Sequence, residues 1–229
     1  MDSLGPRGNG AGGAVNNMLV VTAVPAERDA VLGGTGGDPR IRVIASGAGQ
    51  AAAAAATAAE LAAGDFRVVV SAGIAGGFSG RAGVGSLVVA SEIVAADFGA
   101  ETAEGFRSAD ELGFGSSRIR TDESLVGRLT AAMAAAGLIA CAGPVLTVST
   151  ATGTAATAAE LERRVPDAAA EAMEGFGVAA AARRFGVPAL EIRAISNAVG
   201  PRDRSAWRID EALKALTAAS AVMKEVLLP

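Results

Sequence analysis

Three polar residues of this chain stand next to apolar runs, at places where a small polar molecule could be bound and cleaved. Glu27 comes shortly after the first apolar run, Asn197 ends the last one, and Glu174 follows Met173 at a helix start. A carboxylate can deprotonate water or accept hydrogen bonds from two sugar hydroxyls, and a thioether suits the apolar face of a sugar. The planar amide of Asn197 can donate and accept along the edge of a base. Together these residue types predict a pocket for a nucleoside.

Two glycine-rich segments and one arginine-rich loop add further binding candidates. Ser46-to-Gly49 and Gly73-to-Gly77 each follow an apolar run, so backbone N–H groups and small side chains there allow a ligand to approach closely. Arg202, Arg204 and Trp207 share one loop, and an arginine at that place could grip a carboxylate.

Each of these features also has a purely structural explanation, which the residues alone leave open. Glu27 could be an exposed helix residue, Glu174 a carboxylate facing the helix dipole, and Asn197 a turn residue. The glycine-rich segments could be a tight turn and a crowded corner between strand and loop. Trp207 could simply pack the last helix onto the core.

The composition excludes several kinds of chemistry. The chain has 229 residues, of which 51% are hydrophobic, and a formal net charge of -4. This length suits one α/β domain, and the negative charge argues against a nucleic-acid surface. Histidine is absent and Cys141 is the single cysteine, which excludes histidine-dependent triads, histidine metal sites, internal disulfides and thiolate metal cages. We expect no cofactor and no metal.

The apolar runs also bear on location and partners. No run reaches the roughly 18 residues of a membrane span. Residues 1–17 are rich in Gly and Asn and lack the apolar core of a signal peptide, so we expect a disordered N-terminal extension or residues foreign to the natural chain. We expect a cytoplasmic protein that binds a small-molecule nucleoside, contacts neither nucleic acid nor membrane, and forms a homodimer or higher homo-oligomer.

Strands are expected to alternate with helices along the chain. The expected strands cover residues 18–24, 41–45, 68–72, 87–95, 139–148, 168–173 and 187–198. The expected helices cover residues 25–32, 50–63, 122–136, 154–164, 175–185 and 207–228. Asp122 is the predicted N-cap of the third helix, and residues 100–117 are expected to form a polar loop.

This alternation predicts one α/β domain over residues 18–229, with a mostly parallel, twisted central sheet flanked by helices. Ligands of such sheets bind beyond the carboxyl ends of the strands. The two glycine-rich segments, Glu174 and Asn197 all fall at such ends, which favours one common site.

Read in order, these segments resemble the superfamily of nucleoside phosphorylases and nucleosidases, over nearly all of residues 18–228. The matching segments are Ala23-to-Glu27, Ser46-to-Gly49, Gly73-to-Gly77, Met173-Glu174 and Arg193-to-Ser196. The branch that cleaves methylthioadenosine and adenosylhomocysteine is similar. That branch has an Asp at the place of Asn197, and uses it as the acid that protonates the adenine leaving group.

The chain is more similar to the futalosine hydrolase family. The likeness is carried by residues 171–175 and above all by residues 195–204, followed by Trp207 and Ile209. It implies hydrolysis of the N-glycosidic bond of futalosine to hypoxanthine and dehypoxanthine futalosine, in the futalosine route to menaquinone. Asn197 agrees with this base, because a neutral amide can donate near N7 and O6, whereas an ionised Asp would oppose O6 with a second acceptor.

The resemblance also implies roles for the candidate residues. Glu27 would orient and deprotonate the attacking water, helped by Arg193, as the glycosidic bond breaks toward a ribosyl cation. Glu174 would hold the ribose hydroxyls while Met173 packs on the sugar. The residues implied in binding the base and the benzoate of futalosine are Ala75, Gly76, Thr152, Thr154, and Arg202 or Arg204.

Three other functions fit parts of the same pattern. A purine nucleoside phosphorylase would need a phosphate site, and Glu27 at that place would repel phosphate. Another purine nucleosidase, acting on methylthioadenosine or adenosylhomocysteine, would carry the acid that Asn197 replaces. A non-catalytic nucleoside-binding protein would explain Asn197, but it would not need both Glu27 and Glu174.

Overall fold

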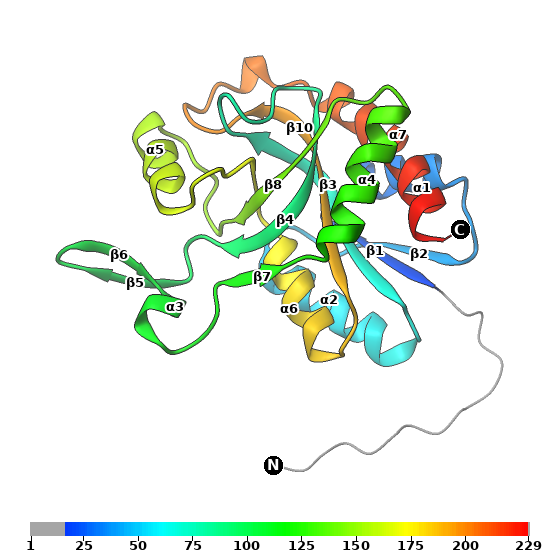
Figure 1. The fold of residues 1–229 in the computed structure, drawn as a ribbon, viewed down its shortest axis with the longest axis horizontal. Helices are drawn as coiled ribbons and strands as arrows, with labels where there is room; N and C mark the ends of the chain where they lie inside the picture. Colours follow the sequence, from blue (N-terminus) through cyan, green and yellow to red (C-terminus); the bar gives the residue numbers. More distant parts are fainter. Residues whose placement is uncertain (1–16, 229) are drawn as a thin grey trace, which may run out of the picture.

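The computed structural model describes residues 17–228, in which strands and helices alternate along most of the chain (Figure 1). The strands are β1 Met18–Thr22, β2 Ile41–Ala45, β3 Val68–Gly77, β4 Leu87–Ala95, β5 Gly99–Thr102, β6 Gly105–Ser108, β7 Arg118–Arg120, β8 Ala140–Thr147, β9 Ala170–Ala172 and β10 Ala189–Ala198. The helices are α1 Pro25–Thr35, α2 Gln50–Ala63, α3 Ala109–Leu112, α4 Glu123–Ala135, α5 Ala155–Arg164, α6 Gly175–Arg184 and α7 Ile209–Leu227, with a 3-10 turn at Arg204–Ala206. The expected disordered extension lies, except for Asn17, outside the described residues.

The central sheet is mixed and closes on itself. Parallel pairing joins β1 to β2 and β3, β3 to β10, and β8 to β4 and β9. Antiparallel pairing joins β10 to β4, β3 to β9 and β4 to β7. Strands β3, β10, β4, β8 and β9 therefore form a closed ring, from which β1 and β2 extend as an open wing.

The expected α/β class is confirmed, and the sheet is mixed, with five parallel and three antiparallel pairings and a closed ring of strands. The chain between β3 and β4 spans only residues 78–86, too short for the helical crossover that returns a strand in the same direction. As a result β4 runs antiparallel to β10, and the alternation of strands and helices did not predict this pairing or the closed ring.

Helices cover both faces of the wing and of the adjoining part of the ring (Figure 1). In β1, Met18 and Val20 pack into the core beneath α1, α4 and α7, whereas Leu19 and Val21 pack against α2 and α6. Successive side chains of a strand point to opposite faces, so a strand covered on both faces must be apolar at every position. This explains why β1 is a continuous apolar run.

The helix boundaries follow from local capping. Pro25 opens α1, as expected for a residue with a fixed φ and no N–H group. The Asp122 carboxylate accepts from the Leu125 N–H at 3.0 Å, which confirms the predicted N-cap of α4. Thr154 caps α5 in the same way, through the Thr157 N–H. None of the helices in residues 17–228 is long and apolar enough to span a membrane.

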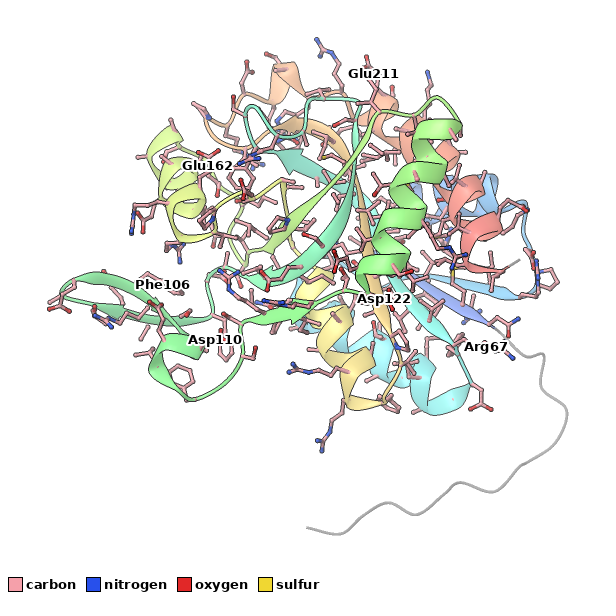
Figure 2. The ribbon with its side chains drawn as sticks, in the orientation of Figure 1. Arg67, Phe106, Asp110, Asp122, Glu162 and Glu211 are labelled. Carbon is pink, nitrogen blue, oxygen red and sulfur yellow. The ribbon has the colours of Figure 1, made fainter. Side chains whose placement is uncertain are left out.

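The polar loop expected over residues 100–117 was wrong. Strands β5 and β6 form a hairpin that projects from the body with α3, as Phe106 and Asp110 show in Figure 2. Ser108 begins α3 with a capping box in which its hydroxyl and the Glu111 carboxylate each accept a backbone N–H. This Ser-x-x-Glu spacing was the signal in the sequence that the loop prediction overlooked.

Candidate active site

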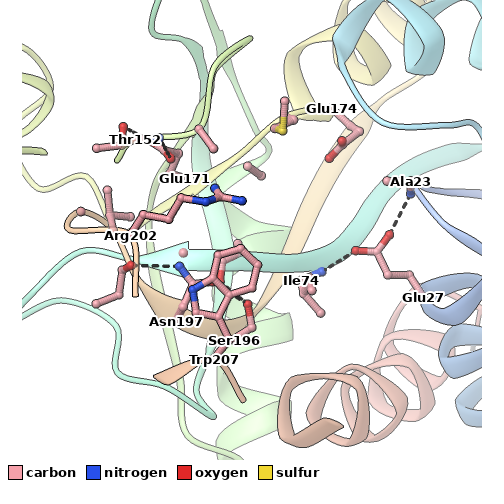
Figure 3. A pocket seen from close by; sticks show the side chains of 18 of the residues that line it. Ala23, Glu27, Ile74, Thr152, Glu171, Glu174, Ser196, Asn197, Arg202 and Trp207 are labelled. Carbon is pink, nitrogen blue, oxygen red and sulfur yellow. Dashed lines mark hydrogen bonds between the residues drawn. The ribbon is translucent and has the colours of Figure 1, made fainter. Parts of the chain in front are cut away.

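A cavity of about 260 Å³ opens where β1, β3, β9 and β10 end, at their carboxyl ends or just beyond (Figure 3). Eight of the predicted site residues lie in its wall: Glu27, Ala75, Gly76, Thr152, Met173, Glu174, Asn197 and Arg202. Closure of the strand ring brings these residues together, because β3 pairs with both β9 and β10.

Three predicted site residues do not line this cavity. Arg193 is buried behind its wall, with 1% of its surface exposed. Thr154 serves as the N-cap of α5. Arg204 lines a separate surface hollow, which Trp207 also lines.

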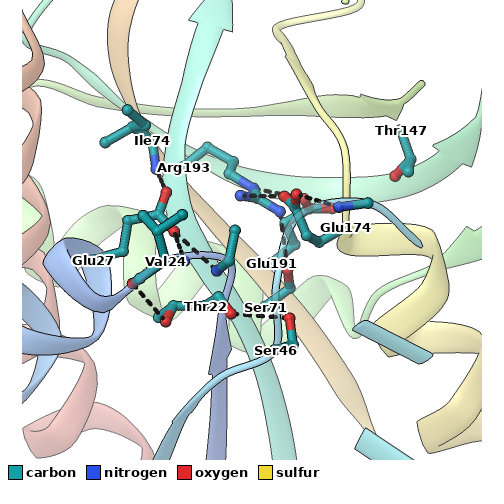
Figure 4. Close-up of polar contacts among 12 residues, drawn as sticks. Thr22, Val24, Glu27, Ser46, Ser71, Ile74, Thr147, Glu174, Glu191 and Arg193 are labelled. Atoms are coloured by element: carbon teal, nitrogen blue, oxygen red, sulfur yellow. Dashed lines mark hydrogen bonds and ion pairs between the residues drawn. The ribbon is translucent and has the colours of Figure 1, made fainter. Parts of the chain in front are cut away.

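Glu27 is fixed by backbone donors at one end of the cavity (Figure 4). Its Oε2 accepts from the N–H groups of Ala23 and Val24 at 2.9 and 3.1 Å, and its Oε1 accepts from the Ile74 N–H at 2.8 Å. The side chain is 3% exposed, so the exposed-helix alternative is wrong. A carboxylate held in this way keeps one orientation in the cavity wall.

Arg193 is the centre of a buried ion-pair network (Figure 4). Its Nε donates to Glu191 Oε1 at 2.8 Å, its Nη1 lies 3.3 Å from Glu174 Oε2, and its Nη2 donates to Ser71 Oγ at 3.0 Å. Burial alone would lower the pKa of Arg193, but the charges of Glu191, Glu174 and Glu27 outweigh it and raise that pKa above the ordinary value. Arg193 therefore stays charged and holds the acidic residues in place.

Glu174 connects this network to the cavity. Its Oε1 accepts from the Gly49 N–H at 3.1 Å, which assigns one N–H of the first glycine-rich segment to a carboxylate of the protein. Its Oε2 contacts Arg193, as described above, while the side chain also lines the cavity. The neighbouring Met173 lines the same wall.

Gly73 lies next to the side chains of both Glu27 and Arg193. A Cβ atom added there would lie 2.6 Å from Glu27 Oε1 and 2.7 Å from Arg193 Nη1. The second glycine-rich segment is thus neither a turn nor a loop corner, since β3 runs through it to Gly77. Because Gly73 has no side chain, Glu27 and Arg193 can approach the strand at this position.

We expect Gly73→Ala to reduce turnover roughly 10²-fold, because displacement of a reacting group by about 1 Å can have an effect of this size. Steady-state kinetics would measure it, with Gly83→Ala as the control, since nothing lies within 4 Å of a Cβ at that position. Equal activity of the two variants would show that the position of Glu27 is not critical.

Asn197 lies at a bulge near the end of β10. Ile195 pairs with Ala75 and Asn197 with Gly76, so Ser196 is an extra residue on this strand. Asn197 Oδ1 accepts from Ser196 Oγ at 2.8 Å, and its Nδ2 donates to the Ala198 carbonyl at 2.9 Å. These two bonds orient the amide and leave its second N–H free to meet a ligand.

Glu171 was missed among the candidates, although it lies in the cavity wall and is 8% exposed. Its Oε1 accepts from the Thr152 N–H at 2.9 Å, and its Oε2 bonds to the Thr152 hydroxyl. Burial raises the pKa of Glu171, the Thr152 hydrogen bonds oppose that rise, and the charge of Asp97 adds to it. Its position two residues before Met173 was the available signal, since alternate residues of a strand share a face.

Arg202 and Trp207 line the cavity close to Asn197 (Figure 3). The Arg202 guanidinium stands 5.2 Å from the centre of the indole ring, and that of Arg204 stands 5.9 Å from it. Of these two arginines, Arg202 is the one that lines the cavity. Packing of the last helix onto the core is therefore not a complete explanation of Trp207, because its side chain also lines the cavity.

Comparison with known proteins shows the family of this chain. Residues 18–228 match the phosphorylase superfamily. A futalosine hydrolase of Streptomyces coelicolor is 52% identical, over 92% of this chain and 96% of its own. The chain belongs to the futalosine hydrolase family. Another futalosine hydrolase, of Acidothermus cellulolyticus, is 45% identical over 90% of this chain and 89% of its own, and the resemblance inferred from the motifs is confirmed.

Solved structures share the fold of this futalosine hydrolase family member. The futalosine hydrolase of Helicobacter pylori superposes with a TM-score of 0.77 at 20% identity, covering 93% of this chain and 97% of its own. A methylthioadenosine/adenosylhomocysteine nucleosidase of Neisseria meningitidis gives 0.77 at 23% identity, covering 93% of this chain and 98% of its own. At these identities the likeness establishes the fold alone.

Proposed function

We propose that this protein hydrolyses the N-glycosidic bond of futalosine, releasing hypoxanthine and dehypoxanthine futalosine in the futalosine route to menaquinone. The observation that carries the proposal is a single cavity with the fixed Glu27 carboxylate at one end and the Asn197 amide away from it. The 52% identity to a futalosine hydrolase supports the choice of substrate.

The reaction begins as the bond between C1′ and N9 lengthens, so that positive charge develops on the ribosyl ring. Glu27 orients a water molecule, accepts its proton as the oxygen attacks C1′, and passes from carboxylate to carboxylic acid. Glu174 accepts hydrogen bonds from the ribose hydroxyls through lone pairs not used by Gly49 and Arg193.

The charge balance of the site favours the ribosyl cation. Glu27, Glu174 and Glu191 are three buried carboxylates gathered around one cation, Arg193. The surplus negative charge is fixed in place before the reaction, so it stabilises positive charge on the sugar more than it stabilises the neutral ground state. The same surplus would oppose a bound phosphate, which favours water as the nucleophile over a phosphorylase reaction.

At the base, Asn197 donates its free N–H near N7 and O6 of the departing hypoxanthine. An amide cannot protonate the leaving group, so the base leaves as an anion whose charge the hydrogen bond stabilises. The anion then takes a proton from solvent to become hypoxanthine, and Glu27 returns to the carboxylate by releasing to solvent the proton it took from water. A neutral donor also suits the O6 acceptor of a 6-oxopurine better than a carboxylate would.

We expect Asn197→Asp to shift preference from 6-oxopurine toward 6-aminopurine nucleosides. An ionised Asp accepts from the adenine amino group, and a neutral Asp protonates N7. The ratio of kcat/KM for futalosine to kcat/KM for aminodeoxyfutalosine should fall at least tenfold, about 1.4 kcal/mol. A folded variant with an unchanged ratio would mean that Asn197 does not read position 6.

We propose that Arg202, rather than Arg204, binds the benzoate carboxylate of futalosine, with the ring beside Trp207. Arg202→Ala should raise KM for futalosine roughly 10- to 100-fold, because a charged hydrogen bond is lost. Arg204→Ala is the matched control and should stay within a few-fold of wild type. The KM for inosine, which lacks the benzoate, should be unchanged by both substitutions. A larger rise in KM for futalosine in Arg204→Ala than in Arg202→Ala would contradict the assignment.

Release of bases from three nucleosides tests the proposed function. Futalosine, inosine and methylthioadenosine are incubated separately with the protein, and the free bases are separated by chromatography. We expect hypoxanthine from futalosine at the highest rate. Faster release of adenine from methylthioadenosine would favour the other nucleosidase, and binding of futalosine without release would favour a non-catalytic binding protein.

The homodimer or higher homo-oligomer and the cytoplasmic location expected from the sequence stay predictions. Light scattering of the purified chain would give the oligomeric state.

A further inference from the structure

Glu171 is a carboxylate of the cavity that the reaction described above does not use. Glu27 and Glu174 are held toward the water and the sugar by the contacts already described. Glu171 comes from β9 and lies with Thr152 at the other end of the cavity, away from Glu27 (Figure 3). It therefore faces the part of the cavity in which Asn197 meets the base.

The contact between Glu171 and Thr152 changes what the loop after β8 can offer to a base. The backbone N–H of Thr152 donates to Glu171 Oε1 at 2.9 Å, and the Thr152 hydroxyl is engaged with Oε2. Neither donor is free for an acceptor atom of a ligand. A carboxylate has about four lone-pair sites, so Glu171, which lines the cavity, keeps acceptor capacity beyond its two contacts with Thr152. At this place the wall offers an acceptor in place of a donor.

Purines differ in what they present along this edge. A 6-oxopurine carries a proton on N1 and needs an acceptor opposite it. A 6-aminopurine has a bare N1, which is itself an acceptor and would stand against the carboxylate with no proton between them. Because a buried polar group without a partner is costly, an acceptor in the wall discriminates between the two bases.

We propose that Glu171, held by Thr152, accepts the N1–H of the 6-oxopurine and so sets the base specificity together with Asn197. This assignment rests on the proposed function, because it takes the base end of a purine nucleoside site as given. Asn197 supplies a donor for N7 and O6 at one edge, and Glu171 supplies an acceptor for N1 at the next. Asn197 and Glu171 together match the two acceptors of hypoxanthine, N7 and O6, and its donor, N1–H. The assignment requires no contact with any other position of the purine.

Binding of free bases tests the assignment without turnover. Isothermal titration calorimetry would compare hypoxanthine with adenine on wild type, Glu171→Gln and the control Glu162→Gln. Glu162 is an exposed residue of α5 outside the cavity wall (Figure 2). Gln keeps the size of Glu171 but can turn an NH₂ toward N1. We expect the ratio of hypoxanthine affinity to adenine affinity to fall roughly 10- to 100-fold in Glu171→Gln and to be unchanged in the control.

A second measurement uses the wild-type protein, so it does not depend on the folding of a variant. In 1-methylhypoxanthine the N1 proton is replaced by a methyl group, and we expect at least tenfold weaker binding than for hypoxanthine. An unchanged base ratio in folded Glu171→Gln, or equal binding of the two bases by wild type, would overturn the assignment. Absence of hypoxanthine release from futalosine, with base binding that still depends on Glu171, would instead overturn the proposed function alone.

Discussion

Glu27→Gln is expected to bind futalosine as well as wild type and to lose roughly 10²- to 10⁴-fold of its turnover, the usual contribution of a general base. Gln keeps the size of the side chain, but its one oxygen can accept either from Ala23 and Val24 or from Ile74, so a thermal melt is recorded to verify that the variant folds. What it cannot do is take a proton from water. The measurement is single-turnover release of hypoxanthine, with substrate affinity measured separately.

The matched control is Glu162→Gln, which makes the same chemical change outside the cavity and should behave as wild type. A Glu27→Gln variant within a few-fold of wild-type turnover would show that the buried carboxylate is structural. In that case another group would have to activate the water.

Arg193→Met is expected to lose about 3–5 kcal/mol of stability, together with nearly all activity. Met fills much of the same volume but leaves Glu191 and Glu174 as buried carboxylates without their cation. The Oε2 atom of Glu191 already has no hydrogen-bond partner among the described residues, so this carboxylate has little else to stabilise it. Urea denaturation followed by circular dichroism would measure the loss.

A double variant separates the ion pair from the packing. Adding Glu191→Met to Arg193→Met removes one of the stranded charges, so part of the lost stability should return, although activity should not. A single Arg193→Met variant within about 1 kcal/mol of wild type, the range of an exposed pair, would contradict the structural role given to this network.

Most of the secondary structure could be predicted because the strands of the core are rich in apolar residues. Residues 18–22, 41–45 and 87–95 are covered by the strand predictions. The first is apolar almost throughout, and the other two are interrupted only at Arg42 and at Ser91 and Glu92. The hairpin of β5 and β6 could not be found in this way, because it projects from the body and its side chains are half-buried or exposed. Without a buried face it has no apolar periodicity.

The closure of the sheet could not be predicted from local patterns. It depends on β9, a strand of three residues that pairs with Gly76 and Gly77 far earlier in the chain. Local propensity does not specify such long-range pairings. The predicted mostly parallel sheet placed the strand ends correctly at one edge but missed the ring that joins them.

The same limit applies to the site. Residue type and position next to an apolar run were enough to select Glu27, Glu174 and Asn197, which all lie in one cavity. The role of Glu171 depends on its contact with Thr152, and no spacing in the sequence indicates that contact. Arg193 was assigned to the water by resemblance, whereas its contacts are with Glu191, Glu174 and Ser71 behind the wall.

The central claim is that water, activated by Glu27, cleaves the glycosidic bond of futalosine. The most direct test is the initial rate of hypoxanthine release, measured in phosphate-free buffer and again with excess phosphate added. The mass of the sugar product is determined under both conditions. We predict equal rates and, in both buffers, a sugar product with a free hydroxyl at C1′. Release that requires phosphate and yields a sugar 1-phosphate would contradict the account.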